Sequence, residues 1–268
     1  MDIIDIIFLC DLSDYVKTRH SNPNLIKSIA LIECSISDTS DQVLRSLGWI
    51  ESATGFEVVS LSMNSEVTGK SFKLFKDLKE INLYGCENLQ TNYFINFCQN
   101  NQTLIRLNIN ECYGYNGNRP FLDQECINCI AENLQNLEVL AFDCPNISNG
   151  TKLSALADLP KLKSLYLEDC NLLAVPLLDR LAKHNRLEVF DWSLNDDDEK
   201  NIACLFLATL KFQGLKEYAL ADFSGKTTFV IDELLYQATM NNLVELIIPE
   251  TTVTDEGIYQ FILKNPSP

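Results

Sequence analysis

Apolar residues recur along the chain in a nine-residue pattern, in which positions 1, 4 and 6 are apolar and position 9 favours Cys or Asn. The pattern begins at Ile26, Phe56, Leu78, Leu104, Leu137, Leu162, Leu187, Leu215 and Leu243. Successive starts are 22 to 33 residues apart, about 27 on average. Because alternate residues of a strand face opposite sides of a sheet, the pattern predicts short strands that bury positions 4 and 6. Positions 3, 5 and 7 are expected on the outer face.

Segments with the spacing of amphipathic helices lie between these strands. They begin at Leu153, Pro176, Asn201, Ile231 and Asp255, and each has apolar residues at i and i+3 or i+4. A strand followed by a returning helix, with this period and consensus, is typical of leucine-rich repeats. One such unit cannot bury its apolar side alone, so neighbouring units stack on a continuous core.

We therefore expect an α/β fold: a right-handed leucine-rich-repeat solenoid, or horseshoe, with parallel strands on the concave face and helices on the convex face. Residues 26–268 are expected to form about nine repeats of this solenoid. Residues 1–25 are expected to be an N-terminal cap or a degenerate repeat, in which Ile4, Ile7 and Leu9 fit the apolar positions.

Cysteine occupies position 9 of several repeats, at Cys34, Cys86, Cys112 and Cys170. With the period and with TVTDEGIYQFI from Thr252, the sequence resembles the cysteine-containing leucine-rich repeats over roughly residues 26–264. These repeats are best known as the substrate-binding halves of F-box ubiquitin-ligase adaptors. The resemblance implies a substrate-recognition or adaptor role, and a Skp1-type adaptor as partner where an F-box is present. The residues before Ile26 show no three-helix pattern, so the F-box itself is not seen.

The charge balance narrows the range of partners. The chain has 37 acidic and 21 basic residues and a formal net charge of −16. Nucleic-acid backbones and anionic membranes repel such a chain, so neither is expected as a partner. The first residues, MDIIDIIFLC, lack the positive charge of a secretory signal, and the ten cysteines are scattered singly. We expect an intracellular protein, cytoplasmic or nuclear, whose sequons at Asn101, Asn146 and Asn149 go unused.

No phosphate-binding, dinucleotide or nucleophile-elbow motif occurs, and His184 is expected to be exposed at a helix end. Cys126 and Cys129 form a C-x-x-C pair, for which a zinc site would need two further ligands at matching spacing. Helical spacing places both thiols on the face of Ile130 and Leu134, so packing is the favoured interpretation and metal or redox chemistry the alternative. We expect no enzyme activity, no catalytic residues, no cofactor and no metal.

The outer face of the strands is the predicted binding surface. Its candidate partner-binding residues are Tyr84, Arg106, Asn108, Asp143, Tyr166, Glu168, Asp191 and Glu217. Tyrosines beside acids are common in binding patches, which favours a protein partner with a basic segment. The alternative is that the acids of this face only mirror an acidic chain.

Two further segments have competing interpretations. The repeat from Leu104 is 33 residues long, and its surplus at residues 113–124 is either a binding insertion or a surface loop. The acids from Asp196 to Glu199 are expected to begin a helix rather than to bind a ligand. We predict a non-enzymatic protein-interaction module. The alternatives are an acidic leucine-rich-repeat regulator of a basic protein and an activator of a small GTPase.

Overall fold

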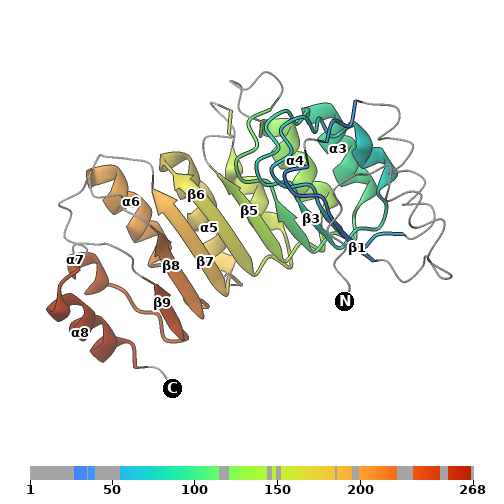
Figure 1. The fold of residues 1–268 in the computed structure, drawn as a ribbon. Coiled ribbons are helices and arrows are strands. Elements are labelled where there is room, and N and C mark those ends of the chain that lie inside the picture. Colours follow the sequence, from blue (N-terminus) through green and yellow to red (C-terminus); the bar gives the residue numbers. More distant parts are fainter. Residues whose placement is uncertain are drawn as a thin grey trace. The chain divides into compact units, whose positions relative to one another are not determined.

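The computed structural model describes residues 27–34, 36–39, 55–114, 121–143, 147–148, 152–184, 186–194, 199–221, 232–247 and 253–266. Strands and helices alternate along this part of the chain, and the predicted α/β class with parallel strands is confirmed (Figure 1). The nine described strands belong to one open parallel sheet, in which they follow one another in sequence order. Each strand begins two residues after the start of an apolar repeat, as at Ser28 after Ile26 and Glu245 after Leu243.

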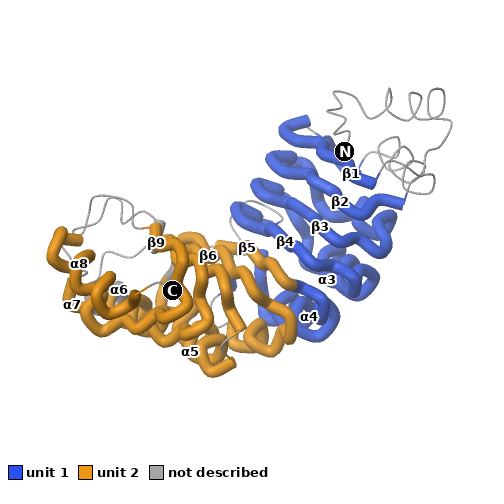
Figure 2. Tube along the Cα trace, turned by 90° about the horizontal axis from the view of Figure 1, so that it is seen from below, with its two compact units in different colours: residues 1–137, 145–151 blue, residues 138–144, 152–268 orange. Residues whose placement is uncertain are grey.

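The chain is divided into two compact units. Residues 1–137 and 145–151 belong to unit 1, and residues 138–144 and 152–268 to unit 2 (Figure 2). The described elements of unit 1 are β1 (Ser28–Ala30), β2 (Val58–Ser60), η2 (Lys70–Leu74), β3 (Glu80–Asn82), α3 (Thr91–Asn100), β4 (Arg106–Asn108) and α4 (Gln124–Asn133). Its strands pair in parallel without a register shift, so that Glu80 lies opposite Arg106 and Asn82 opposite Asn108.

Unit 2 contains the longer strands. Its described elements are β5 (Val139–Asp143), η4 (Leu153–Asp158), β6 (Ser164–Cys170), η5 (Leu172–Ala174), α5 (Val175–His184), β7 (Val189–Leu194), α6 (Glu199–Thr209), β8 (Glu217–Ala221), α7 (Asp232–Leu235), β9 (Glu245–Ile247) and α8 (Asp255–Lys264). The described helices lie on one face of its strands, and none of them covers the other face, which is called the open face below (Figure 1).

The core of unit 2 lies between the strands and these helices. Positions 4 and 6 of β5, β6 and β7 are buried as predicted, for example Leu165 and Leu167 in β6 and Phe190 and Trp192 in β7. The one buried polar group on Trp192 is satisfied, because its indole N–H donates to the hydroxyl of Tyr218 at 3.0 Å. This bond fixes the orientation of two large side chains in neighbouring strands.

Turns at the ends of the strands repeat with the sequence pattern. Position 8 has a left-handed backbone in five described repeats, at Glu33, Met63, Gly85, Glu111 and Asp169, with φ between 49° and 68°. Position 9 then returns towards the preceding repeat: Asn64 Nδ2 donates to the carbonyl of Leu31 at 2.6 Å. The thiols of Cys86 and Cys112 donate to Leu61 and Leu83 in the same way, at 3.2 and 3.1 Å. In these three repeats the side chain at position 9 therefore bonds to the backbone of the preceding repeat.

The predicted helices are present in part. Those expected from Pro176, Asn201 and Asp255 correspond to α5, α6 and α8. The segment from Leu153 was expected to be α-helical and is the 3₁₀-helix η4 instead, which ends just before Pro160. Proline disfavours the α-helical backbone conformation in the residue that precedes it, and short connections commonly adopt 3₁₀ turns. The segment from Ile231 has a single described turn, α7. Among the helices that the structure describes, none is long and apolar enough to cross a membrane.

Candidate functional site

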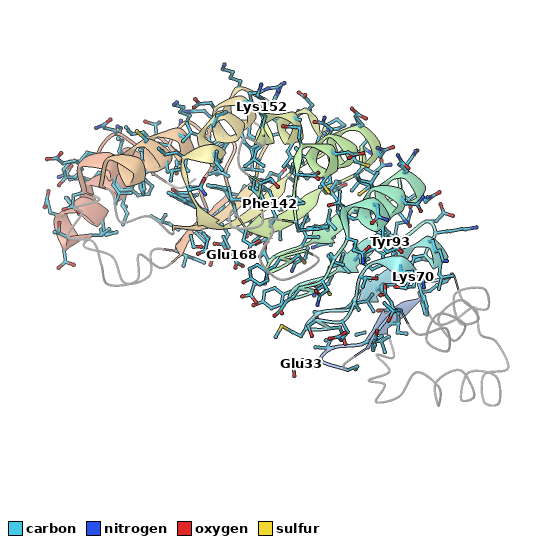
Figure 3. All side chains as sticks on the ribbon, turned by 90° about the horizontal axis from the view of Figure 1, so that it is seen from above. Glu33, Lys70, Tyr93, Phe142, Lys152 and Glu168 are labelled. Carbon is cyan, nitrogen blue, oxygen red and sulfur yellow. The ribbon has the colours of Figure 1, made fainter. Side chains whose placement is uncertain are left out.

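The open face of the unit 2 sheet presents two rows of side chains. Position 3 contributes Val139, Ser164, Val189, Glu217 and Glu245, and position 5 contributes Ala141, Tyr166, Asp191, Ala219 and Ile247. In Figure 3, Glu168 lies on this strand side, Lys152 on the helix side, and Phe142 between them. The two rows therefore face away from the described helices, and most of their side chains are partly or fully exposed.

Tyr166 and Asp191 are direct neighbours across β6 and β7. Both are partly exposed, and alanines at Ala141 and Ala219 flank the pair in the same row. Because an alanine side chain is a single methyl group, the phenol ring and the carboxylate rise above both flanks. The register thus places Ala141, Tyr166 and Asp191 next to one another in one row.

Partial burial changes the acidity of Asp191. Desolvation raises the pKa of its carboxyl group above the ordinary value of 3.8, because burial disfavours the charged form. A cation placed beside the carboxylate would offset this cost, and the ring of Tyr166 next to it offers a face for the same cation. The pair is thus suited to an arginine or lysine side chain.

Glu168 lies two residues beyond Tyr166, at a β-bulge. Leu167 pairs with Trp192 and Cys170 with Leu194, so β6 has one residue more than β7 between these pairs. Asp169, at φ 49°, donates its backbone N–H to Ser193 Oγ at 2.8 Å within the bulge. Bulges redirect side chains and are frequent beside functional sites. Here Glu168 is exposed and lies two residues beyond Tyr166, in the segment where the pairing with β7 is irregular.

Glu217 continues the acidic side of the face. It begins β8, lies opposite Glu245 of β9, and both side chains are exposed. Asp191 pairs with Ala219, two residues further along β8, so Glu217 is a diagonal neighbour of Asp191. Diagonal neighbours in a sheet are about 7–8 Å apart. Three carboxylates therefore gather on β7, β8 and β9.

Asp143 was predicted to be a partner-binding residue, but it does not belong to the exposed face. It is only 3% exposed at the end of β5. The same position 7 is buried in unit 1, at Ser62 and Asn110. Other position-7 residues are exposed, such as Ile32 and Glu168, so the burial of this position differs from repeat to repeat.

Unit 1 holds the remaining three predicted residues. The exposed Arg106 forms an ion pair with Glu80 of the neighbouring strand, 3.4 Å from Nε to Oε1. Asn108 Oδ1 accepts the backbone N–H of Asn110 at 3.0 Å, and Asn82 Oδ1 accepts that of Tyr84 at 3.1 Å. Tyr84 is half-buried in the turn after β3. The two asparagines thus support the turns, which the repeat pattern alone did not indicate.

The C-x-x-C pair lies in the core of unit 1. Cys126 and Cys129 are buried in α4 on the same side as Ile130 and Leu134, as the packing interpretation predicted. Burial raises the pKa of Cys126, whereas a hydrogen bond with Cys98 lowers that of Cys129. Among the described residues, no group of three or more His, Cys, Asp or Glu side chains is placed to hold a metal ion.

The long repeat contributes to the core as well as to the surface. Of the predicted insertion, Phe121 and Leu122 are buried, and the Phe121 ring packs edge-on against Phe94 of α3 with centroids 5.1 Å apart. Asp123 caps α4, accepting the N–H of Cys126 at 2.8 Å. The end of the segment was therefore wrongly included in the insertion. Its residues 115–120 lie outside the described residues.

Other predicted surface features have mixed outcomes. His184 is exposed in the last turn of α5, as predicted. Asn101 is fully buried and bonds to the backbone of Leu78, Phe75 and Phe97, so its sequon is inaccessible. Asp196 to Asp198, the sequons at Asn146 and Asn149, and residues 1–25 lie outside the described residues.

No protein-family model matches the chain, and no curated protein is significantly similar to it in sequence.

Proposed function

We propose that the chain is a leucine-rich-repeat solenoid that serves as a non-enzymatic protein-interaction module. Two observations support the repeat architecture: every described strand begins at position 3 of an apolar repeat, and Asn64, Cys86 and Cys112 bond to position 6 of the preceding repeat. The right-handed connection is part of the proposal, since parallel β-α-β units almost always have that hand.

The binding surface in this proposal is the open sheet face of unit 2, and its ligand is a protein segment that carries arginine or lysine. The observation that carries the proposal is the pairing of Tyr166 with Asp191 between two alanines. Glu168 and Glu217 add negative charge on either side of the pair. A guanidinium or ammonium group placed there gains ion pairing and contact with the ring face.

Affinity capture with the whole chain, followed by mass spectrometry, identifies partners, and a double variant tests the site. Tyr166→Ala with Asp191→Lys should weaken binding of the captured partner by more than tenfold. The matched control is Tyr259→Ala with Glu256→Lys, a tyrosine and an acid exposed on α8. It should leave affinity within twofold of the original. Unchanged affinity in the first variant, with normal folding, would refute the site.

The finer proposal is a substrate-recognition or adaptor role in a ubiquitin-ligase assembly, which rests on the resemblance of the cysteine-containing repeats. It implies an intracellular setting, cytoplasmic or nuclear. Recovery of an F-box-binding adaptor with the chain in a native pull-down would support it. The carboxylates on β7, β8 and β9 favour a second candidate, a regulator that sequesters a basic protein. Partners released at moderate salt, without any ligase component, would support that candidate instead.

A further inference from the structure

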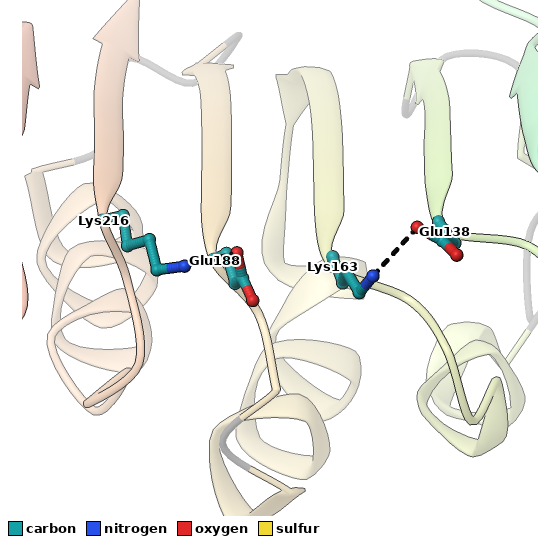
Figure 4. Close-up of polar contacts among 4 residues, drawn as sticks. All are labelled: Glu138, Lys163, Glu188 and Lys216. Atoms are coloured by element: carbon teal, nitrogen blue, oxygen red, sulfur yellow. Dashed lines mark hydrogen bonds and ion pairs between the residues drawn. The ribbon is translucent and has the colours of Figure 1, made fainter.

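A ladder of alternating charges crosses unit 2 at the starts of its strands. Position 2 of four successive repeats is Glu138, Lys163, Glu188 and Lys216 (Figure 4). Lys163 Nζ lies 3.0 Å from Glu138 Oε2, and Lys216 Nζ lies 2.8 Å from Glu188 Oε2. The hydrogen bond from Lys216 lowers the pKa of Glu188, and the positive charge of Lys163 lowers this pKa as well. The ladder therefore holds its lysines in a defined row across the strands.

A groove of about 560 Å³ runs along this ladder. Its second wall comes from the residue before each repeat, namely Lys161, Arg186, Gly214 and Asn242. Arg186 Nη1 donates to the carbonyl of Pro160 at 3.1 Å, which holds the guanidinium at the rim. The side chain of Val244, at position 2 of the last repeat, is 77% exposed and adds an apolar wall at one end.

The charge of the groove is opposite to that of the chain. Its lining contains the cations of Lys161, Lys163, Arg186 and Lys216 and the single carboxylate of Glu188. Even with Glu138 counted as the partner of Lys163, positive charge remains in excess, four groups to two, in a chain of net charge −16. Unit 1 also has lysines at position 2, Lys27 and Lys79, but the residues before its repeats are not basic: Leu25, Gly55, Asp77 and Thr103. Lys161 and Arg186 are therefore the cations that distinguish unit 2.

We propose that this groove binds an extended acidic peptide segment of a protein partner, with its Asp or Glu side chains on Lys161, Lys163, Arg186 and Lys216. The groove crosses the starts of β6, β7, β8 and β9. Neighbouring strands are about 4.8 Å apart, so the four span about 14 Å, the length of about four extended residues. Charge complementarity selects an acidic occupant, and the exposed Val244 and Pro160 offer apolar contact at the two ends of the groove.

The proposal is independent of the sheet-face site. Tyr166 and Asp191 occupy position 5 of their strands, whereas the groove is lined by position 2 and by the residue before the repeat. The face prefers cations and the groove prefers anions. A partner with an acidic stretch and a basic stretch would engage both, but each site binds its own segment.

Fluorescence anisotropy with the peptide GEELEEG, labelled with fluorescein, tests the groove. The whole chain should bind it at least tenfold more tightly than GQQLQQG, and 0.5 M NaCl should abolish the difference. Lys161→Glu with Arg186→Glu should weaken binding of GEELEEG by tenfold or more. Lys161→Arg with Arg186→Lys should retain it, because the positive charges remain.

The matched control is Lys73→Glu with Lys76→Glu, two exposed lysines of unit 1 that give the same change in net charge. It should shift the affinity by less than twofold, which separates a local site from the total charge. Equal affinity for the two peptides, no measurable binding of GEELEEG, or equal losses in both double variants would overturn the proposal. Tyr166→Ala with Asp191→Lys should still bind GEELEEG, so failure of the groove and failure of the face are distinguishable.

Discussion

The backbone N–H of Asp169 donates to the side-chain oxygen of Ser193 at 2.8 Å across the bulge between β6 and β7. This bond joins Asp169, the left-handed residue next to the end of β6, to the side chain at position 7 of β7. It fixes the point at which Glu168 leaves the regular pairing of the sheet. The acidic residue beside Tyr166 is therefore positioned by a serine one strand away.

Replacing Ser193 with alanine should loosen this bulge. The partly buried N–H of Asp169 would lose its acceptor, which typically costs about 1–3 kcal/mol. We expect a lower midpoint of urea unfolding and weaker binding of a basic partner, because Glu168 is no longer held beside Tyr166. Ser154→Ala, which removes a hydroxyl from η4 and not from the sheet, is the control and should change neither. An unaltered midpoint in Ser193→Ala would show that the bulge does not depend on this bond.

Asp191 should make the protein less stable as pH rises. Burial raises its pKa in the folded protein above 3.8, the value expected for an unfolded chain. Between those two pKa values the folded state binds more protons, so its free energy of unfolding falls with increasing pH. Asp191→Asn cannot titrate and should escape this loss. The variant should gain stability relative to the original chain between pH 3 and pH 7, measured by urea unfolding at each pH.

The opposite trend would show that the carboxylate is stabilised in the folded state. A basic partner bound at Asp191 would lower the pKa of the carboxyl group. The affinity of such a partner should therefore increase as the pH rises from 3 to 7.

The apolar period was sufficient to predict the strands and part of the site. In a parallel sheet without register shifts, residues at the same position of successive repeats become neighbours, which placed Tyr166 beside Asp191. The period contains no information on turns. The burial of Asp143 and the bulge at Glu168 depend on how the chain leaves each strand. The spacing of the repeats does not reveal the bulge, because β6 and β7 start 25 residues apart with or without it.

The basic groove was missed for a different reason. The basic residues of the groove are spread over 56 residues of an acidic sequence, so the overall composition gives no sign of them. They are Lys161, Lys163, Arg186 and Lys216. They form a cluster only when the repeats are aligned on their strands. η4 was misassigned because apolar spacing of three to four residues fits both helix types, and the backbone before Pro160 decides between them.

Gly85 should resist substitution. It lies at position 8 with φ 68°, and a Cβ there would come within 2.7 Å of Met63 Sδ. Gly85→Ala should lower the free energy of unfolding by about 1–2 kcal/mol, as expected for a residue with a side chain in the left-handed region. Chemical unfolding of the single variant and of Gly85→Ala with Met63→Ala separates the two causes. If backbone conformation dominates, most of the loss should persist in the double variant.

Asn64 and Cys112 occupy the same position 9 but should differ in what they contribute. Asn64 is fully buried, donates to the carbonyl of Leu31 and accepts the N–H groups of Cys34 and Ile36 at 3.0 and 3.2 Å. Cys112 offers only a weak thiol donor to the carbonyl of Leu83.

Asn64→Ala leaves several buried backbone groups without partners, each worth about 1–3 kcal/mol, so the loss should exceed 3 kcal/mol. Cys112→Ala should cost about 1 kcal/mol, mainly through lost packing of the sulfur. Thermal unfolding monitored by circular dichroism, with urea titration for the free energies, measures both. Equal losses would mean that the bonds of position 9 contribute less than its volume, and Asn64→Cys, which keeps one donor, should then be harmless. If the bonds matter, Asn64→Cys should lie between the alanine variant and the original chain.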